Sequence, residues 1–558
     1  MLLSSAFTAL TALLPLASAL PQISRKGKYL FDPSGNRFYI KGVAYQPQGA
    51  LAASSEANDA NGGFPEPSSY IDPLSSGSNC TRDIPYLQQL GVNAVRVYSV
   101  NSSLNHDDCM SALDTAGIYV LLDVSLPLNG SIDRASPAWT TNLLDQYITT
   151  INKFNGYSNV LAYNVGNEVI NTVNNTAAAP FVKAAARDTK AYLTSIGSKA
   201  LVGYSATDGE PDFRTQLADY MTCGNDSVTI DLYGLNNYEW CGDSTYNTSG
   251  WNTIVSDFTN ITVPVYMSEY GCITSPPRLW TEVAALFSTP VSDVFSGGVA
   301  FSYFPTSDGY GMVTFSSDGN TVTTSDDFTR LATQYNATSP PNSPAQSSVT
   351  ATELTCPDES SSLLASTNLP PTPQESVCDC INSQALACRI IAATADSPNK
   401  IGALTDYACS LLGSSNSTVT CSSIAGDGTT GVYGQLAMCS PEIKLNYVMS
   451  AWYESNGLAS SCDFDGNATL SSNMPNTADD ANTAAQACLA NQSTVVTPTA
   501  QSGNAPAATS TASTGSGSGT TSSSGKASAA VAVMGMPSIA VLAVTAVGVV
   551  LGAAAIVA

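Results

Sequence analysis

The sequence contains a single histidine, His106, among its 558 residues. Every Ser-His, Cys-His or histidine-rich metal mechanism would have to depend on this one side chain. His106 lies in the polar segment Asn-His-Asp-Asp, where a structural role is expected. Carboxylate chemistry is therefore the main catalytic option left, and we expect neither a metal nor a cofactor.

Basic residues are also scarce, with 20 Lys and Arg against 44 Asp and Glu, and the formal net charge is −24 at pH 7. So acidic a chain has no basic patch able to neutralise phosphates, which argues against nucleic acid and anionic membrane surfaces as partners. An uncharged ligand such as a neutral glycan is compatible with this charge. Solubility in a mildly acidic medium would explain it equally well.

A glycine-rich phosphate loop is missing after every apolar β-type run. These runs alternate with helical stretches between residues 20 and 336, which favours a (β/α)8 TIM barrel with its active site at the carboxyl ends of the strands. An open doubly wound sheet would explain the alternation alone, but it would normally carry such a loop. The expected strands are 38–45, 94–98, 119–124, 160–164, 200–204, 230–234, 263–267 and 299–303, and the expected helices include 84–90, 109–116, 139–154, 178–196 and 277–287.

Two glutamates each close one of these apolar runs, Glu168 in segment 161–168 and Glu269 in segment 265–272. If they end the fourth and seventh strands, they face each other across the barrel mouth. A separation of ~5 Å between two carboxyl groups is typical of retaining glycosidases, in which one carboxyl protonates the leaving oxygen and the other attacks the anomeric carbon. The side-chain amide of Asn167 is placed to donate to a sugar 2-hydroxyl.

Aromatic and charged residues also fall at the expected strand ends. Tyr98, Tyr238 and Tyr303 offer rings that stack on sugar C–H faces and hydroxyls that hydrogen-bond. Arg96 and Asp123 either orient the catalytic carboxylates or form a structural ion pair near the barrel mouth.

Residues 1–19 form an apolar segment that ends in Ala17-Ser18-Ala19, which is typical of a secretory signal peptide. The fourteen cysteines fit an oxidising compartment. At the other end, a Ser/Thr-rich segment 493–525 precedes the apolar tail 526–558, which is typical of a glycosylphosphatidylinositol (GPI) anchor attached at Ser523 or Ser524. A true tail-anchor helix is the rival interpretation.

The chain between the barrel and the tail divides into two parts. Residues 337–375 are rich in Pro, Ser and Thr and read as a partly extended linker. Residues 376–492 are dense in cysteine and predict a small disulfide-stapled, mainly helical module. The barrel cysteines Cys80, Cys109, Cys223, Cys241 and Cys272 pair evenly only if Cys356 joins them.

Several motifs make the barrel resemble glycoside hydrolase family 72, the fungal cell-wall β-1,3-glucanosyltransferases. They are Lys41-Gly42-Val43-Ala44-Tyr45-Gln46, Arg96-Val97-Tyr98-Ser99, Gly166-Asn167-Glu168, Asn236-Asn237-Tyr238-Glu239-Trp240-Cys241-Gly242 and Ser268-Glu269-Tyr270-Gly271-Cys272. The resemblance implies a (β/α)8 barrel with Glu168 as acid/base and Glu269 as nucleophile. It further implies sugar contacts by Gln46, Tyr98, Asn167, Asn236, Tyr238, Tyr303 and Tyr310, to which we add Asp123, and the disulfides Cys80–Cys109, Cys223–Cys356 and Cys241–Cys272.

Residues 376–492 resemble carbohydrate-binding module family 43 through Val377-Cys378-Asp379-Cys380 and the segment from Lys444 to Tyr453. The resemblance implies the disulfides Cys378–Cys439, Cys380–Cys488, Cys388–Cys462 and Cys409–Cys421. Trp452 stands where the family more often carries another aromatic residue. A helper domain that only stabilises the barrel is the alternative to glucan binding.

The expected function is that of a retaining β-1,3-glucanosyltransferase that cleaves an internal bond and passes the new reducing end to the non-reducing end of another glucan chain. An endo-β-1,3-glucanase and an inactive glucan-binding wall protein are the alternatives. β-1,3-Glucan is the expected donor and acceptor, and the expected location is the outer face of the plasma membrane, through a lipid anchor, or the cell wall.

Overall fold

The structure is a computed structural model that describes residues 19–50, 68–127, 130–414, 419–473, 475–493 and 496–498. The signal segment before Ala19, the anchor sites Ser523 and Ser524 and the apolar tail lie outside these residues. Within them, no helix combines the length and the apolar character needed to cross a membrane.

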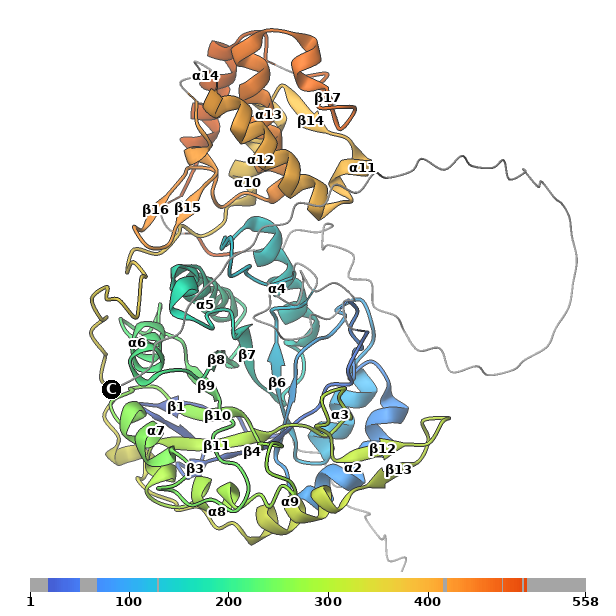
Figure 1. Cartoon of the computed structure of the whole chain (residues 1–558), viewed down its shortest axis with the longest axis vertical. Coiled ribbons are helices and arrows are strands. Elements are labelled where there is room, and N and C mark those ends of the chain that lie inside the picture. Colours follow the sequence, from blue (N-terminus) through green and yellow to red (C-terminus); the bar gives the residue numbers. More distant parts are fainter. Residues whose placement is uncertain are drawn as a thin grey trace, which may run out of the picture. The chain divides into compact units, whose positions relative to one another are not determined.

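Eight parallel strands close into a barrel surrounded by helices (Figure 1), so the predicted (β/α)8 fold is confirmed. Around the barrel the strands run in the order β10-β11-β4-β5-β6-β7-β8-β9. Their bounds are β4 Ile40–Ala44, β5 Ala94–Val97, β6 Tyr119–Asp123, β7 Val160–Asn167, β8 Leu201–Thr207, β9 Leu232–Asn236, β10 Val265–Tyr270 and β11 Phe295–Ala300.

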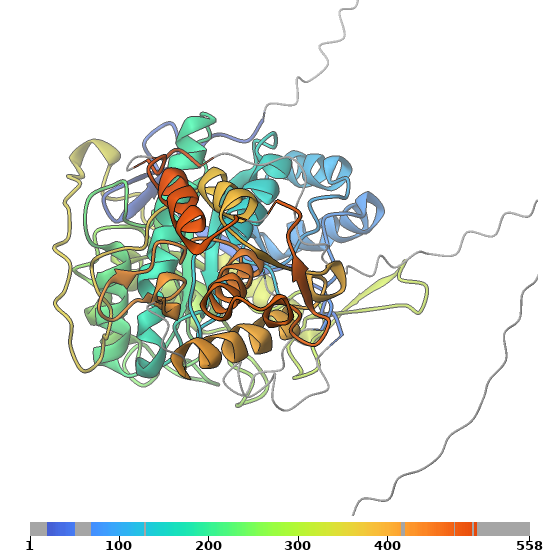
Figure 2. The same ribbon diagram turned by 90° about the horizontal axis from the view of Figure 1, so that it is seen from above.

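The outer helices connect these strands. They are α2 Gly77–Leu90, α3 Asp107–Thr115, α4 Thr141–Phe154, α5 Ala179–Ser195, α6 Pro211–Thr222, α7 Trp251–Phe258, α8 Glu282–Leu286 and α9 Asp326–Ala337, with 3-10 turns at Val173–Ala178 and Val291–Asp293. A small sheet of β1 Ser24–Lys26, β2 Tyr29–Phe31 and β3 Arg37–Phe38 packs through Ile23 and Leu30 on residues at the start of the barrel strands. The hairpin of β12 Val313–Phe315 and β13 Val322–Thr324 projects away from the barrel in both views (Figure 1 and Figure 2).

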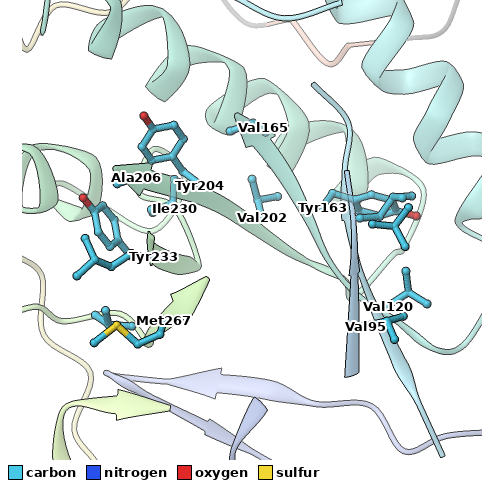
Figure 3. Close-up of a cluster of buried hydrophobic side chains, with 14 of the residues drawn as sticks. Val95, Val120, Tyr163, Val165, Val202, Tyr204, Ala206, Ile230, Tyr233 and Met267 are labelled. Atoms are coloured by element: carbon cyan, nitrogen blue, oxygen red, sulfur yellow. The ribbon is translucent and has the colours of Figure 1, made fainter. Parts of the chain in front are cut away.

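Side chains alternate along each barrel strand between the helices and the barrel interior. Val95, Val120, Val202 and Met267 belong to the layer between strands and helices (Figure 3). The interior holds apolar residues such as Leu121, but further along β5 and β6 the interior positions are Arg96 and Asp123. The barrel core therefore becomes charged toward the carboxyl ends of the strands, where the catalytic face of this fold lies.

The last barrel strand lies earlier than its predicted position at 299–303. β11 spans Phe295–Ala300 and includes Gly297 and Gly298, a pair that does not read as a strand. Gly297 has φ +88, and a Cβ there would lie 2.1 Å from the carbonyl oxygen of Ile40 on β4. The glycine thus allows β11 to approach β4 and close the barrel.

The predicted helix at 277–287 is also shorter than expected. Only Glu282–Leu286 is helical, because Trp280 has φ +57 and the side chain of Arg278 holds the preceding loop to other elements. Residues 276–281 therefore form a loop at the catalytic end of β10 rather than a helix turn.

The cysteine-rich part has its own apolar core and is mainly helical, as predicted. Its elements are α10 Glu375–Gln384, β14 Cys388–Ile390, α11 Ala392–Ala395, α12 Pro398–Ser414, β15 Gly426–Asp427, β16 Val432–Tyr433, α13 Pro441–Asn456, β17 Ala468–Leu470 and α14 Ala478–Leu489. The structure joins the same seven cysteine pairs that the family resemblances imply: Cys80–Cys109, Cys223–Cys356, Cys241–Cys272, Cys378–Cys439, Cys380–Cys488, Cys388–Cys462 and Cys409–Cys421.

The predicted linker runs along the barrel through specific hydrogen bonds. Tyr39 donates to the carbonyl of Pro341, and Arg187 on α5 donates to that of Pro370. Beyond the linker, the ring of Tyr433 on β16 meets Phe181 on α5 edge to face, with 5.6 Å between ring centroids. These contacts are consistent with a module that also stabilises the barrel.

Candidate active site

Glu269 lies in β10 with its carboxylate at the barrel mouth and is 8% exposed. Its Oε1 accepts hydrogen bonds from Tyr98 at 2.9 Å and from Arg96 Nη1 at 3.2 Å. Its Oε2 accepts one from Tyr238 at 2.8 Å. Arg96 lies on β5, Tyr98 just after β5, and Tyr238 in the loop after β9. Together these three donors fix both oxygens of the Glu269 carboxylate.

Burial raises the pKa of Glu269 to about 7, and the nearby Glu168 raises it as well. The Arg96 charge and the hydroxyls of Tyr238 and Tyr98 act in the opposite direction. The donors thus partly compensate a desolvation cost that would otherwise keep the carboxyl protonated. Ionisation of Glu269, which nucleophilic attack requires, depends on these three partners.

Arg96 is fully buried and connects several groups of the site. Its Nη2 donates to Asp123 Oδ2 at 2.9 Å and to Asn167 Oδ1 at 2.8 Å. Asp123 also accepts from Asn164 at 2.7 Å and is 1% exposed. Asp123, predicted as a sugar contact, therefore lies beneath the site, where it orients Arg96.

Glu168 directly follows β7 and has a left-handed backbone with φ +50. Its backbone N–H donates to the backbone carbonyl of Ser205 at 2.8 Å, and its own carbonyl accepts from Arg134 Nη2 at 3.0 Å. These bonds hold a conformation that is unfavourable for a residue with a Cβ. The half-buried carboxylate is thereby directed toward the barrel mouth instead of continuing the strand alternation.

Asn236, at the end of β9, links the two halves of the site. Its Nδ2 donates to Glu168 Oε1 at 2.7 Å, and its Oδ1 accepts from Ser268 at 2.7 Å. The same Nδ2 lies 3.3 Å from Asn167 Oδ1. Asn167 Oδ1 thus accepts from both Asn236 and Arg96, and the amide N–H2 group of Asn167 donates to no group of the described residues.

Four aromatic rings lie together beside Glu269. Phe301, the first residue after β11, meets Tyr98 and Tyr238 edge to face at centroid distances of 6.3 and 6.4 Å. Tyr310 lies 5.1 Å from Phe301 and 5.7 Å from Tyr238. All four residues are half-buried, so part of each ring is available to a ligand.

Tyr303 is not part of this cluster, although it was predicted to contact sugar. Its side chain is buried, its hydroxyl donates to Asp83 at 3.1 Å, and its ring packs on Tyr45. The reason is the earlier position of β11, which ends at Ala300 and places Phe301 at the mouth. Phe301 was missed for the same reason, and an apolar alternation counted from Phe295 is the signal that would have found it.

Gln46 supports the site from the loop after β4. Its Oε1 accepts from the backbone N–H groups of Tyr98 and Ser99 at 3.2 and 3.0 Å, and its Nε2 donates to the carbonyl of Ile71 at 2.6 Å. Gln46 is half-buried and positions the backbone that carries Tyr98.

The disulfide Cys241–Cys272 joins the loop after β9 to the loop after β10. Cys241 lies three residues after Tyr238, and Cys272 lies three residues after Glu269. A covalent bond therefore ties the loop that follows Glu269 to the loop that carries its hydrogen-bond donor Tyr238. Across the described residues, no group of three or more His, Cys, Asp or Glu side chains is arranged to hold a metal ion.

A family model described as glucanosyltransferase, glycoside hydrolase family 72, matches residues 13–339 of this chain. The chain belongs to this family. A second model, the X8 domain, matches residues 386–469 in the cysteine-rich module. The sequence-based identification of family 72 with a carbohydrate-binding module is therefore confirmed, and the chain is a 1,3-β-glucanosyltransferase.

Relatives are similar along most of their length. The chain is 40% identical over 469 residues to 1,3-beta-glucanosyltransferase gas1 of Schizosaccharomyces pombe, which covers 83% of this chain and 81% of the relative. It is 40% identical over 442 residues to 1,3-beta-glucanosyltransferase GAS2 of Saccharomyces cerevisiae, covering 78% and 76%. A solved structure of a Saccharomyces cerevisiae Gas2p mutant with laminaritetraose and laminaripentaose superposes with a TM-score of 0.72 at 36% identity, covering 84% of this chain and 99% of that one.

Proposed function

We propose that this 1,3-β-glucanosyltransferase elongates β-1,3-glucan by a retaining double displacement, with Glu269 as nucleophile and Glu168 as acid/base. The observation that carries this assignment is the different environment of the two carboxylates. Glu269 forms an ion pair with Arg96 and accepts hydrogen bonds from Arg96, Tyr98 and Tyr238, all of which favour its ionised form. Among the described residues, the side-chain donor to Glu168 is Asn236 alone. A carboxylate that several donors keep ionised suits the nucleophile, and a carboxyl with fewer donors suits the group that gives and takes a proton.

In the first step Glu269 forms a bond to the anomeric carbon of an internal glucose while the C1–O3 bond of the glucan breaks. Glu168 gives its proton to the departing O3, and the reducing-end fragment leaves. In the second step Glu168 takes the proton from the 3-hydroxyl at the non-reducing end of another chain. That oxygen attacks C1, Glu269 is released as a carboxylate, and the anomeric configuration is retained.

Within this cycle Asn167 donates its amide to the 2-hydroxyl of the glucose being attacked, a contact that strengthens in the transition state. Tyr98, Tyr238, Phe301 and Tyr310 provide faces for neighbouring sugars. Transfer also requires an acceptor hydroxyl that outcompetes water at ~55 M, so bound acceptor sugars must be held at high effective molarity.

The test uses the secreted enzyme and a laminari-oligosaccharide tagged at its reducing end, with products read by mass spectrometry. Products longer than the donor are expected from transfer. Products that are only shorter would identify a hydrolase, and an unchanged donor would identify a binding protein.

The two roles are separated by azide rescue. Glu269→Ala with azide is expected to yield the α-glycosyl azide, because azide replaces the nucleophile. Glu168→Ala with azide is expected to yield the β-product, because azide replaces the acceptor on the glycosyl-enzyme. The opposite stereochemical results would reverse the assignment.

The proposed setting is extracellular, with β-1,3-glucan as donor and acceptor and a lipid anchor as the membrane attachment. The seven disulfides are consistent with folding in an oxidising compartment. Release of the protein from membranes by a phosphatidylinositol-specific phospholipase tests the anchor. Retention on insoluble glucan, compared with and without residues 376–492, tests glucan binding by the module.

A further inference from the structure

Arg278 lies in the loop between β10 and α8 and is 8% exposed. Its Nε donates to Asp327 Oδ2 on α9 at 2.8 Å, and its guanidinium lies over the ring of Trp280 at 4.5 Å. Trp280 Nε1 in turn donates to Asp327 Oδ1 at 2.9 Å. The guanidinium is thus anchored on the outer side of the barrel by an ion pair and an aromatic face.

The opposite edge of the same guanidinium reaches toward the active site. Arg278 Nη1 donates to the carbonyl of Phe301 at 2.6 Å and lies 3.4 Å from the carbonyl of Gly271. Phe301 is the first residue after β11, and Gly271 is the second residue after Glu269. One nitrogen therefore joins the loop of the nucleophile to the loop that carries the central ring of the aromatic cluster.

Phe301 connects this point to the nucleophile. Its ring contacts Tyr98 and Tyr238 edge to face, and the hydroxyls of these two tyrosines donate to the two oxygens of Glu269. The guanidinium also lies 5.7 Å from the centroid of the Tyr310 ring, which packs edge to face on Phe301. A continuous set of contacts runs from Asp327 through Arg278 and Phe301 to Glu269.

We propose that Arg278 is a positioning residue for the nucleophile: by holding the carbonyls of Phe301 and Gly271 it keeps the tyrosine hydroxyls aligned on Glu269. Its contribution lies in the ionisation of Glu269 and not in direct contact with substrate.

A purely structural role is the competing explanation, and Arg37 shows what that role looks like in this protein. Arg37 is also 8% exposed, donates to two backbone carbonyls, those of Ser343 and Ser292, and lies over the rings of Tyr29 and Tyr39. Among the described residues, Arg37 has no hydrogen bond or ring contact with Glu168, Glu269 or the side chains that donate to them. Arg37 is therefore a matched control for the loss of a buried arginine.

The charged and titratable groups around the nucleophile define the expected effect. Glu269 faces Arg96 on β5, Tyr98 after β5, Glu168 after β7 and Tyr238 after β9. The groups facing Arg278 are Asp327, Arg330, Glu282 and Tyr310. When Phe301 is no longer held, the tyrosine hydroxyls leave Glu269, its ionised form loses donors, and its pKa rises. The acidic limb of the kcat/KM profile then moves to higher pH.

The experiment compares Arg278→Gln, Arg278→Lys and Arg37→Gln in the full secreted chain, with kcat/KM for a laminari-oligosaccharide measured across pH. In both Arg278 variants the acidic limb is expected to move up by about 0.5 to 1 pH unit. Lysine keeps the positive charge but cannot span Asp327 and the two carbonyls at once, so its shift separates positioning from simple electrostatics. Arg37→Gln is expected to leave the limb in place even where it lowers the melting temperature.

An unshifted limb in Arg278→Lys overturns the proposal, whatever the loss of rate. An equal shift of the acidic limb in Arg37→Gln also overturns the proposal, since the loss of any buried arginine would then produce the shift. If Arg278→Gln is not recovered folded, the comparison of Arg278→Lys with Arg37→Gln decides alone.

Discussion

The hydroxyl of Tyr238, in the loop after β9, donates a 2.8 Å hydrogen bond to Oε2 of Glu269 in β10. This bond favours the ionised carboxylate, while burial of the same carboxylate raises its pKa to about 7. The hydrogen-bond donors of Glu269 therefore favour its ionised form, while its burial favours the protonated form.

The first prediction removes that hydroxyl. Tyr238→Phe is expected to lower kcat/KM by about 10- to 100-fold and to move the acidic limb to higher pH, because Glu269 loses a donor to its charged form. Tyr233→Phe is the control, since the buried Tyr233 hydroxyl has no hydrogen-bond partner among the described residues. A Tyr238→Phe profile that superposes on the wild-type profile would refute the role of this bond.

The second prediction separates Phe301 from Tyr303. Phe301→Ala is expected to lower kcat/KM and the proportion of transfer products, because sugar-facing rings lose their central support. Tyr303→Phe is expected to leave the product distribution unchanged and to destabilise the fold by about 1 to 2 kcal/mol, because the buried Asp83 loses a donor. Product analysis and urea unfolding of the two variants measure both effects, and altered products in Tyr303→Phe would return that residue to the substrate site.

The third prediction concerns Glu282 on α8, which is 4% exposed and whose pKa burial raises to about 7. The folded protein thus binds this proton more tightly than the unfolded chain does. The free energy of unfolding is accordingly expected to fall as the pH rises from about 4 to 7, by about 2 to 3 kcal/mol. Glu282→Gln should remove the share of this dependence that comes from Glu282 and be more stable than wild type above pH 7.

Urea unfolding at pH 5 and pH 8 measures this difference. Glu353→Gln, at an exposed position, is the control and is expected to leave the pH dependence as it is. Parallel losses of stability in wild type and Glu282→Gln between the two pH values would contradict the prediction.

The fourth prediction compares two disulfides. Replacing Cys241 and Cys272 by serine is expected to reduce kcat/KM more than replacing Cys80 and Cys109, because only the first pair joins loops of the active site. Thermal unfolding of both double variants provides the correction for stability. Equal activity losses at equal folded fraction would show that the catalytic loops hold their geometry without the bond.

The sequence was sufficient for the barrel and for the candidate carboxylates, because buried parallel strands read as apolar runs and each glutamate ends one. It failed at β11, where Gly297 allows a close approach to β4 and Gly298 a close approach to Met267 on β10, which no local pattern reveals. That error moved the predicted mouth residue from Phe301 to Tyr303. The sequence also left open whether Asp123 contacts sugar or pairs with Arg96. Both roles use the same residue types, and only the position of the side chain in the folded protein distinguishes them.

The backbone of Glu168 has a consequence for selection on this enzyme. A left-handed residue with a Cβ costs on the order of 1 kcal/mol relative to glycine, so the proposed catalytic role of Glu168 opposes folding stability at this position. A library at residue 168 screened for thermal stability should enrich glycine and asparagine, whereas the same library screened for glucan transfer should return glutamate. The most stable form of this protein is therefore expected to be one that no longer performs its reaction.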